Sequence, residues 1–82
     1  MIGKIEDARV YLEQALALRL QALGEHHPET IYSLYTLGLL LAPHDQDNSL
    51  TYFQRALKIC KEEFSTEYPL FEQIQEQIAL LI

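Results

Sequence analysis

The sequence repeats itself at an offset of 41 residues. When residues 1–41 are laid on residues 42–82 without a gap, identical residues coincide: Tyr11 with Tyr52, Ala15 with Ala56, Leu16 with Leu57, and Pro28 with Pro69. Similar apolar residues also coincide: Leu12 with Phe53, Leu18 with Ile59, Leu37 with Ile78, and Leu41 with Ile82. A period of this length is typical of repeat proteins built from small structural units. We therefore expect residues 1–82 to form one domain made of two copies, 1–41 and 42–82.

Each copy carries the pattern of two helices. Apolar residues recur at three- and four-residue spacing from Ile5 to Leu23, which indicates one face of a helix. Gly24 is suited to end that helix, and Pro28 and Pro69 are suited to the first turn of the helix that follows in each copy. We predict an all-α fold of four antiparallel helices near residues 4–23, 28–42, 47–64 and 69–82, with Asp45 or Asp47 as the N-cap of the third.

The second predicted helix, residues 28–42, is apolar nearly all round. Its polar residues are Glu29, Thr30, Ser33 and Thr36. A helix that is apolar on all sides is usually packed between other helices. Pro43 follows it and cannot continue the helical hydrogen bonding. The second helix is therefore expected to lie in the middle of the fold.

The composition argues against several other classes of protein. The formal net charge is −6, and the sequence has no basic stripe, so nucleic-acid binding is not expected. The single cysteine, Cys60, excludes an intramolecular disulfide and fits a reducing compartment. The N-terminus turns acidic at Glu6 before any long apolar run, and the longest such run, residues 37–43, is far too short to span a membrane. We expect a cytoplasmic protein without membrane insertion.

Large apolar and small residues stand at fixed positions of the second and third predicted helices: Leu34, Leu37, Gly38 and Leu41 on one, and Ser49, Phe53 and Ala56 on the other. These positions resemble helix A and helix B of the tetratricopeptide repeat, and in particular the form found in kinesin light chains. In the kinesin light chain form a long helix B ends in a Leu-Gly step and a His-Pro pair starts the next helix A. Leu23-Gly24 and His27-Pro28 are similar. The resemblance implies a helical solenoid in the order B-A-B-A that binds other proteins.

The sequence departs from that family pattern in three places. The turn after Leu41 is one residue shorter and contains Pro43 where the family usually has a glycine-containing turn. Tyr35-Thr36 and Glu76-Gln77 stand where the family often has a pair of asparagines, so the family's ligand specificity does not carry over. The order B-A-B-A contains one complete repeat.

Residues with catalytic or metal-binding potential do not form a known site pattern. His26 and His27 are adjacent, so their rings diverge, and neither they nor His44 have the spacing that brings metal ligands together. Cys60 is expected to be a small hydrophobic residue on a helix, and the alternative is a thiol activated by Lys61. The acidic pairs are expected to be solvated helix faces and not a catalytic dyad: Glu62 with Glu63, and Glu72 with Glu76. We expect no enzyme activity, no metal and no cofactor.

A stripe on the second predicted helix is the candidate site for a partner. Tyr32, Tyr35 and Leu39 share a face that is distinct from the leucine core edge. The repeat offset adds Gln73, Glu76 and Leu80 on the fourth helix. The resemblance implies that these six residues line a concave groove that holds a peptide or partner protein, and the acidic composition favours a partner with basic character. The alternative is that the stripe packs against an adjacent repeat.

A structural role is the alternative to ligand binding. The chain would then consist of terminal repeats of a longer solenoid, or of a self-association unit without a ligand. The last predicted helix offers an apolar set for such contacts: Ile74, Ile78, Leu81 and Ile82. Since large apolar patches seldom stay exposed on monomers, this set predicts a homodimer or end-to-end stacking.

Overall fold

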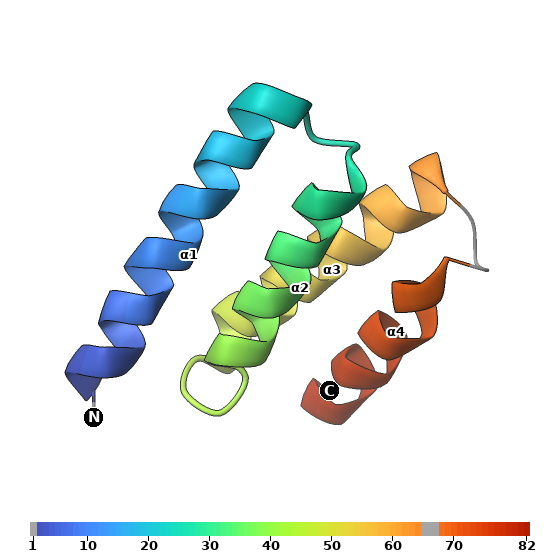
Figure 1. The fold of residues 1–82 in the computed structure, drawn as a ribbon. Helices are drawn as coiled ribbons and strands as arrows, with labels where there is room; N and C mark the ends of the chain where they lie inside the picture. The colour runs from blue at the N-terminus through green and yellow to red at the C-terminus, as the bar shows by residue number, and fades with distance from the viewer. Residues whose placement is uncertain (1, 65–67) are drawn as a thin grey trace.

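Four α-helices form the described part of the chain, residues 2–64 and 68–82 of a computed structural model. They are α1 (Ile2–Leu23), α2 (Pro28–Leu41), α3 (Gln46–Glu63) and α4 (Pro69–Leu81). Each helix packs against the next one in the chain, and Figure 1 shows α2 between α1 and α4 with α3 behind it. The predicted all-α fold is confirmed, with each helix boundary within two residues of its predicted place.

The α1–α2 connection is built from the residues that the sequence marked as stop and start signals. Gly24 has φ +88°, a left-handed conformation that glycine adopts without steric cost. Its N–H donates to the Leu20 carbonyl at 3.0 Å, which closes the last turn of α1. Pro28 then opens α2, and Nδ1 of His27 accepts a hydrogen bond from the Glu29 N–H at 3.1 Å. His27 is therefore the N-cap of α2.

Asp45 is the N-cap of α3, one of the two aspartates that the sequence offered. Its carboxylate accepts the Asn48 backbone N–H at 3.2 Å and the Asn48 side-chain amide at 2.6 Å. Both hydrogen bonds favour the ionised carboxylate, so they lower the pKa of Asp45. Desolvation opposes them, and the nearby charge of Arg9 adds the smallest lowering effect. A cap of this kind satisfies backbone donors that the first turn of a helix leaves unpaired.

The hydrophobic core lies on both sides of α2, as its all-round apolar pattern predicts. Half of the residues of α2 are buried. The core also contains side chains from α1, α3 and α4, and its fully buried or nearly buried members are Leu16, Ile31, Leu34, Leu37, Phe53, Ala56, Ile59, Cys60, Phe71 and Ile74. Most of the burial therefore belongs to the two middle helices, and the end helices contribute one face each.

Gly38 and Ser49 bring α2 and α3 into close contact. A Cβ atom added to Gly38 would lie 2.5 Å from the Phe53 ring, well inside the normal contact distance. The Ser49 hydroxyl donates to the Gly38 carbonyl at 2.6 Å in a buried position. The small residues let the two backbones approach, and the Phe53 ring fills the space that the missing side chain leaves.

Two charged residues of α1 contact neighbouring elements and are not left on a solvent face. Arg9 and Glu13 follow Ile5 by one and two helical turns, at the edge of the apolar face, and both reach α3 or the turn before it. The Arg9 guanidinium lies 3.9 Å from the Asp45 carboxylate, and the Glu13 carboxylate accepts the Tyr52 hydroxyl at 2.9 Å. Burial and the hydrogen bond to Glu13 raise the pKa of Tyr52. Helical periodicity identifies one buried face of α1, whereas α1 contacts both α2 and α3.

Candidate partner-binding surface

Two of the three predicted contact residues of α2 are exposed, although the rest of the helix is largely buried. Tyr32 is 58% exposed and Leu39 is 41% exposed. Tyr35, between them, is half-buried, with its ring centroid 5.7 Å from that of Phe53. Tyr35 therefore supports the core and reaches the surface, whereas Tyr32 and Leu39 are available for contact.

The three predicted residues of α4 are all exposed. Gln73 and Glu76 lie on the surface, and Leu80 is 77% exposed. They occupy the positions of α4 that correspond to Tyr32, Tyr35 and Leu39 through the 41-residue offset. The six residues together are called the α2/α4 stripe below.

A groove adjoins one end of the α2/α4 stripe. Its volume is about 420 Å³, and it is lined by Arg19, Pro28, Glu29, Tyr32 and Tyr68. Tyr32 therefore belongs to both the stripe and the groove. The sequence pattern did not single out Arg19 or Tyr68, because one is a charged residue near the end of a helix and the other lies in a loop. Their spacing from Tyr32 along the chain gives no helical signal.

Hydrogen bonds hold Arg19 in place beside the groove. Its Nη1 donates to the Ser33 hydroxyl, which in turn donates to the Glu29 carbonyl at 3.0 Å. A guanidinium has five N–H donors, so this contact leaves most of its donors for other partners. The groove therefore combines two tyrosine rings with one fixed cation and the carboxylate of Glu29.

The predicted self-association residues of α4 differ in their burial, and the assignment of Ile74 to an open surface is wrong. Ile74 is fully buried, because it packs into the core that α4 shares with α3. Ile78 and Leu81 are half-buried against the same core. Only Ile82 is strongly exposed, at 86%. The apolar set thus forms the inner face of α4, with one member outside it.

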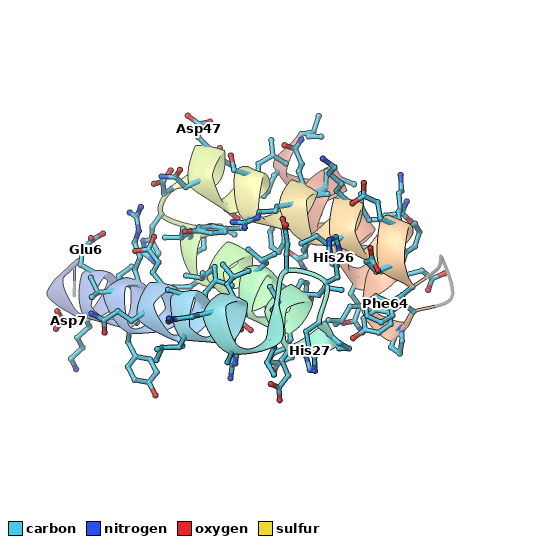
Figure 2. All side chains as sticks on the ribbon, turned by 90° about the horizontal axis from the view of Figure 1, so that it is seen from above. Glu6, Asp7, His26, His27, Asp47 and Phe64 are labelled. Atoms are coloured by element: carbon cyan, nitrogen blue, oxygen red, sulfur yellow. The ribbon has the colours of Figure 1, made fainter. Side chains whose placement is uncertain are left out.

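The histidines have local roles in the loop between α1 and α2. Figure 2 shows His26 and His27 on different sides of this loop. Nδ1 of His26 lies 3.0 Å from the Glu63 carboxylate at the end of α3, and His27 caps α2. Within residues 2–64 and 68–82, no group of three or more His, Cys, Asp or Glu side chains could hold a metal ion.

Cys60 is buried in the core, and burial raises the pKa of its thiol. A raised pKa disfavours the nucleophilic thiolate. Burial of Cys60 therefore argues against the alternative of a thiol activated by Lys61. No helix in the described part of the chain is both long and apolar enough to cross a membrane.

Helices that pack in chain order, with small residues at the central contact and an exposed stripe on α2 and α4, define a helical-repeat protein. A family model described as tetratricopeptide repeat matches residues 1–62, which is more than half of the chain. The chain belongs to the tetratricopeptide repeat family. Such repeats are generally protein–protein interaction modules and are typically non-catalytic. Searches of curated proteins and of solved structures found no match.

Proposed function

We propose that this chain is a non-enzymatic scaffold that holds a peptide or partner protein on the α2/α4 stripe. The observation that carries the proposal is Tyr32, which is 58% exposed on a helix whose other large side chains are mostly buried. An aromatic ring beside a groove supplies a large, rigid contact area at a low entropic cost. Leu39 and Leu80 would extend that contact along the two helices.

Apart from Arg19 in the groove, the charges near the stripe favour a partner with basic character. Glu29 lines the groove beside Arg19, Glu76 lies on the stripe, and the whole chain has a formal charge of −6. The sequence of α4 contains two glutamates and no lysine or arginine. These carboxylates would attract a basic segment and repel an acidic one, so they would contribute mainly to specificity and to the association rate.

We infer further that the repeats are of the kinesin light chain kind. The support is the sequence of the first copy, in which Leu23-Gly24 ends a helix of 22 residues and His27-Pro28 begins the next one. The structure gives each of these residues a defined role, since Gly24 adopts the left-handed conformation and His27 caps α2. Tyr35-Thr36 and Glu76-Gln77 stand where the family often has a pair of asparagines. This chain is therefore expected to bind a different ligand from those of the family.

Selection of peptides from a displayed random library on the immobilised 82-residue chain tests the proposal. We expect selected peptides to contain lysine or arginine next to apolar residues. Tyr32→Ala should weaken their binding at least about tenfold, which corresponds to about 1.4 kcal/mol and is typical of a central aromatic contact. Glu76→Lys should weaken the more basic peptides selectively.

Tyr11→Ala is the matched control, because Tyr11 is also an exposed tyrosine, on α1, and belongs neither to the α2/α4 stripe nor to the groove lining. It should leave binding unchanged. Peptides that bind the parent and Tyr32→Ala with equal affinity would contradict the proposed surface. A library that yields no specific binder would favour the structural alternative, in which the repeats have no ligand of their own.

A further inference from the structure

The groove beside Tyr32 is lined from three parts of the chain. Arg19 comes from α1, Pro28, Glu29 and Tyr32 come from α2, and Tyr68 directly precedes α4. These five residues are called the Tyr32 groove below. Its volume of about 420 Å³ is near the lower end of the range for ligand pockets, about 300–1,000 Å³. It admits a few residues of an extended chain, whereas an α-helix with its side chains is about 10–12 Å across.

Rings supply the apolar part of the Tyr32 groove. Tyr32 is 58% exposed, so much of its ring is open to a ligand. The Tyr68 ring is stacked on the Phe64 ring, with 4.8 Å between the ring centroids and an interplanar angle of 29°. This stacking holds the Tyr68 ring in place before a ligand arrives, so little rotamer freedom is lost on binding. The groove therefore offers a preorganised aromatic surface.

The polar side chains of the Tyr32 groove are rich in hydrogen-bond donors. The Arg19 guanidinium has five N–H donors and no acceptor, and Nη1 donates to the buried Ser33 hydroxyl. This contact fixes the guanidinium and leaves other N–H groups for a ligand. The hydroxyl groups of Tyr32 and Tyr68 can donate as well. A ligand rich in acceptors and poor in donors suits such a groove.

The backbone at the start of α2 is already paired. Pro28 has no N–H, and the Glu29 N–H donates to Nδ1 of His27 at 3.1 Å. The Thr30 N–H donates to the His27 carbonyl at 2.9 Å. A peptide that binds by adding a strand needs unpaired backbone groups. The α2 wall of the groove does not offer them, so side chains must hold the ligand there.

A proline-rich segment has the chemistry that these side chains require. In the polyproline II conformation it has no internal hydrogen bonds, so its carbonyl groups are free to accept from a guanidinium or a hydroxyl. Proline has no N–H, so few backbone donors of the segment would face the donors of the groove. The segment is extended before it binds and packs well against aromatic rings, so it loses little conformational entropy.

We propose that the Tyr32 groove binds a proline-rich segment in the polyproline II conformation, with a lysine or arginine beside the prolines. This inference rests on the proposed function, because it names the class of partner at one end of the α2/α4 stripe. Glu29 is exposed in the groove and would pair with the basic residue. Arg19, held by Ser33, would donate to the carbonyl groups. The two charges of the groove thus serve different parts of the ligand.

Three synthetic peptides separate conformation from charge. Polyproline II has three residues per turn, so repeated Lys-Pro-Pro places the lysines along one edge and the prolines along the other two. Repeated Lys-Ala-Ala keeps the charge and lacks the conformational restraint of proline. Repeated Glu-Pro-Pro keeps the conformation and reverses the charge. Fluorescence anisotropy measures the affinity of each labelled peptide for the 82-residue chain.

We expect the Lys-Pro-Pro peptide to bind at least about tenfold more tightly than either of the other two. Tyr68→Ala should weaken it by a similar factor, although Tyr68 lies outside the α2/α4 stripe. Glu29→Lys should weaken the Lys-Pro-Pro peptide and strengthen the Glu-Pro-Pro peptide, a reversal that misfolding would not produce. Circular dichroism checks that each variant is folded.

Asp7→Lys is the matched control for the charge change. Asp7 is exposed near the start of α1 and does not line the groove, and Figure 2 shows it at the opposite end of α1 from His26 and His27. The variant alters the net charge as Glu29→Lys does. It should leave the order of the three peptide affinities unchanged.

Two results would overturn the inference and leave the proposed function intact. One is equal affinity for the Lys-Pro-Pro and Lys-Ala-Ala peptides, because charge alone would then explain the binding. The other is a Lys-Pro-Pro peptide that fails to bind, while library peptides without proline bind the parent and lose affinity with Tyr32→Ala. A chain that binds none of the peptides, synthetic or displayed, would contradict the inference and the proposed function together.

Discussion

At the scale of residues, the contact between Gly38 and Phe53 fixes the distance between α2 and α3. The ring lies where a Cβ atom of residue 38 would be, and the Ser49 hydroxyl is bonded to the Gly38 carbonyl. Neither helix can be displaced without opening a cavity or breaking this buried hydrogen bond. The small size of residue 38 is therefore a packing requirement and not a backbone requirement, since Gly38 lies in regular helix.

Gly38→Leu tests this requirement. The new side chain would collide with the Phe53 ring, so we expect a loss of about 1–3 kcal/mol in the free energy of unfolding, measured by urea denaturation. Gly3→Leu is the matched control, because a Cβ atom at Gly3 meets nothing within 4 Å. A Gly38→Leu protein that unfolds at the same urea concentration as the parent would show that the α2–α3 register described above is wrong.

Asp45 gives the fold a dependence on pH. Hydrogen bonds from Asn48 hold its pKa below the ordinary value, so the unfolded chain binds this proton more readily than the folded one. The stabilisation is therefore present above the unfolded pKa of about 3.9 and is lost as the pH falls through the lower folded pKa. Asp45→Ala should lower the Tm at pH 7.

The difference in Tm between Asp45→Ala and the parent should shrink as the pH is lowered below about 4. Asp47→Ala is the companion variant, since Asp47 lies in the first turn of the same helix but is not its cap. We expect it to have a smaller effect on the Tm. A difference between Asp45→Ala and the parent that is constant from pH 7 to pH 2 would rule out the ionised cap.

At the scale of elements, most helix boundaries were predictable because single residues set them. Gly24 ends α1, Pro28 and Pro69 begin α2 and α4, and Asp45 caps α3. Each of these residues acts on the backbone within a few positions, so its effect is visible in the local sequence. The contacts of α1 were less predictable, since Arg9 and Glu13 depend on where the distant α3 lies.

The turn at Gly24 provides a test at this scale. The residue has φ +88°, which costs an L-amino acid about 1–2 kcal/mol, so Gly24→Ala should lower the free energy of unfolding by about that amount. Gly3→Ala, inside α1, should instead be neutral or slightly stabilising, because alanine favours the helix. Equal denaturation curves for the two variants would mean that α1 ends in some other way.

At the scale of the whole molecule, the candidate surface was only partly predictable. The repeat offset identified the α2/α4 stripe, and Tyr32, Leu39, Gln73, Glu76 and Leu80 are exposed there. The groove could not be foreseen, because Arg19 and Tyr68 meet Tyr32 only in the folded chain. The same limit explains Ile74, whose burial depends on the position of α4 against α3. The local sequence pattern thus predicts the helices, whereas the surface residues that come together depend on how the helices pack.

The most direct test of the proposed function is a chemical-shift titration of the ¹⁵N-labelled chain with a selected basic peptide. We predict that the largest amide shifts fall on α2 and α4 around Tyr32, Leu39, Gln73 and Leu80, and at the groove residues Arg19 and Tyr68. The exposed side of α3 around Thr51 should not respond. Shifts concentrated on α1 around Tyr11 and Leu18, with the α2/α4 stripe unchanged, would contradict the proposed binding surface.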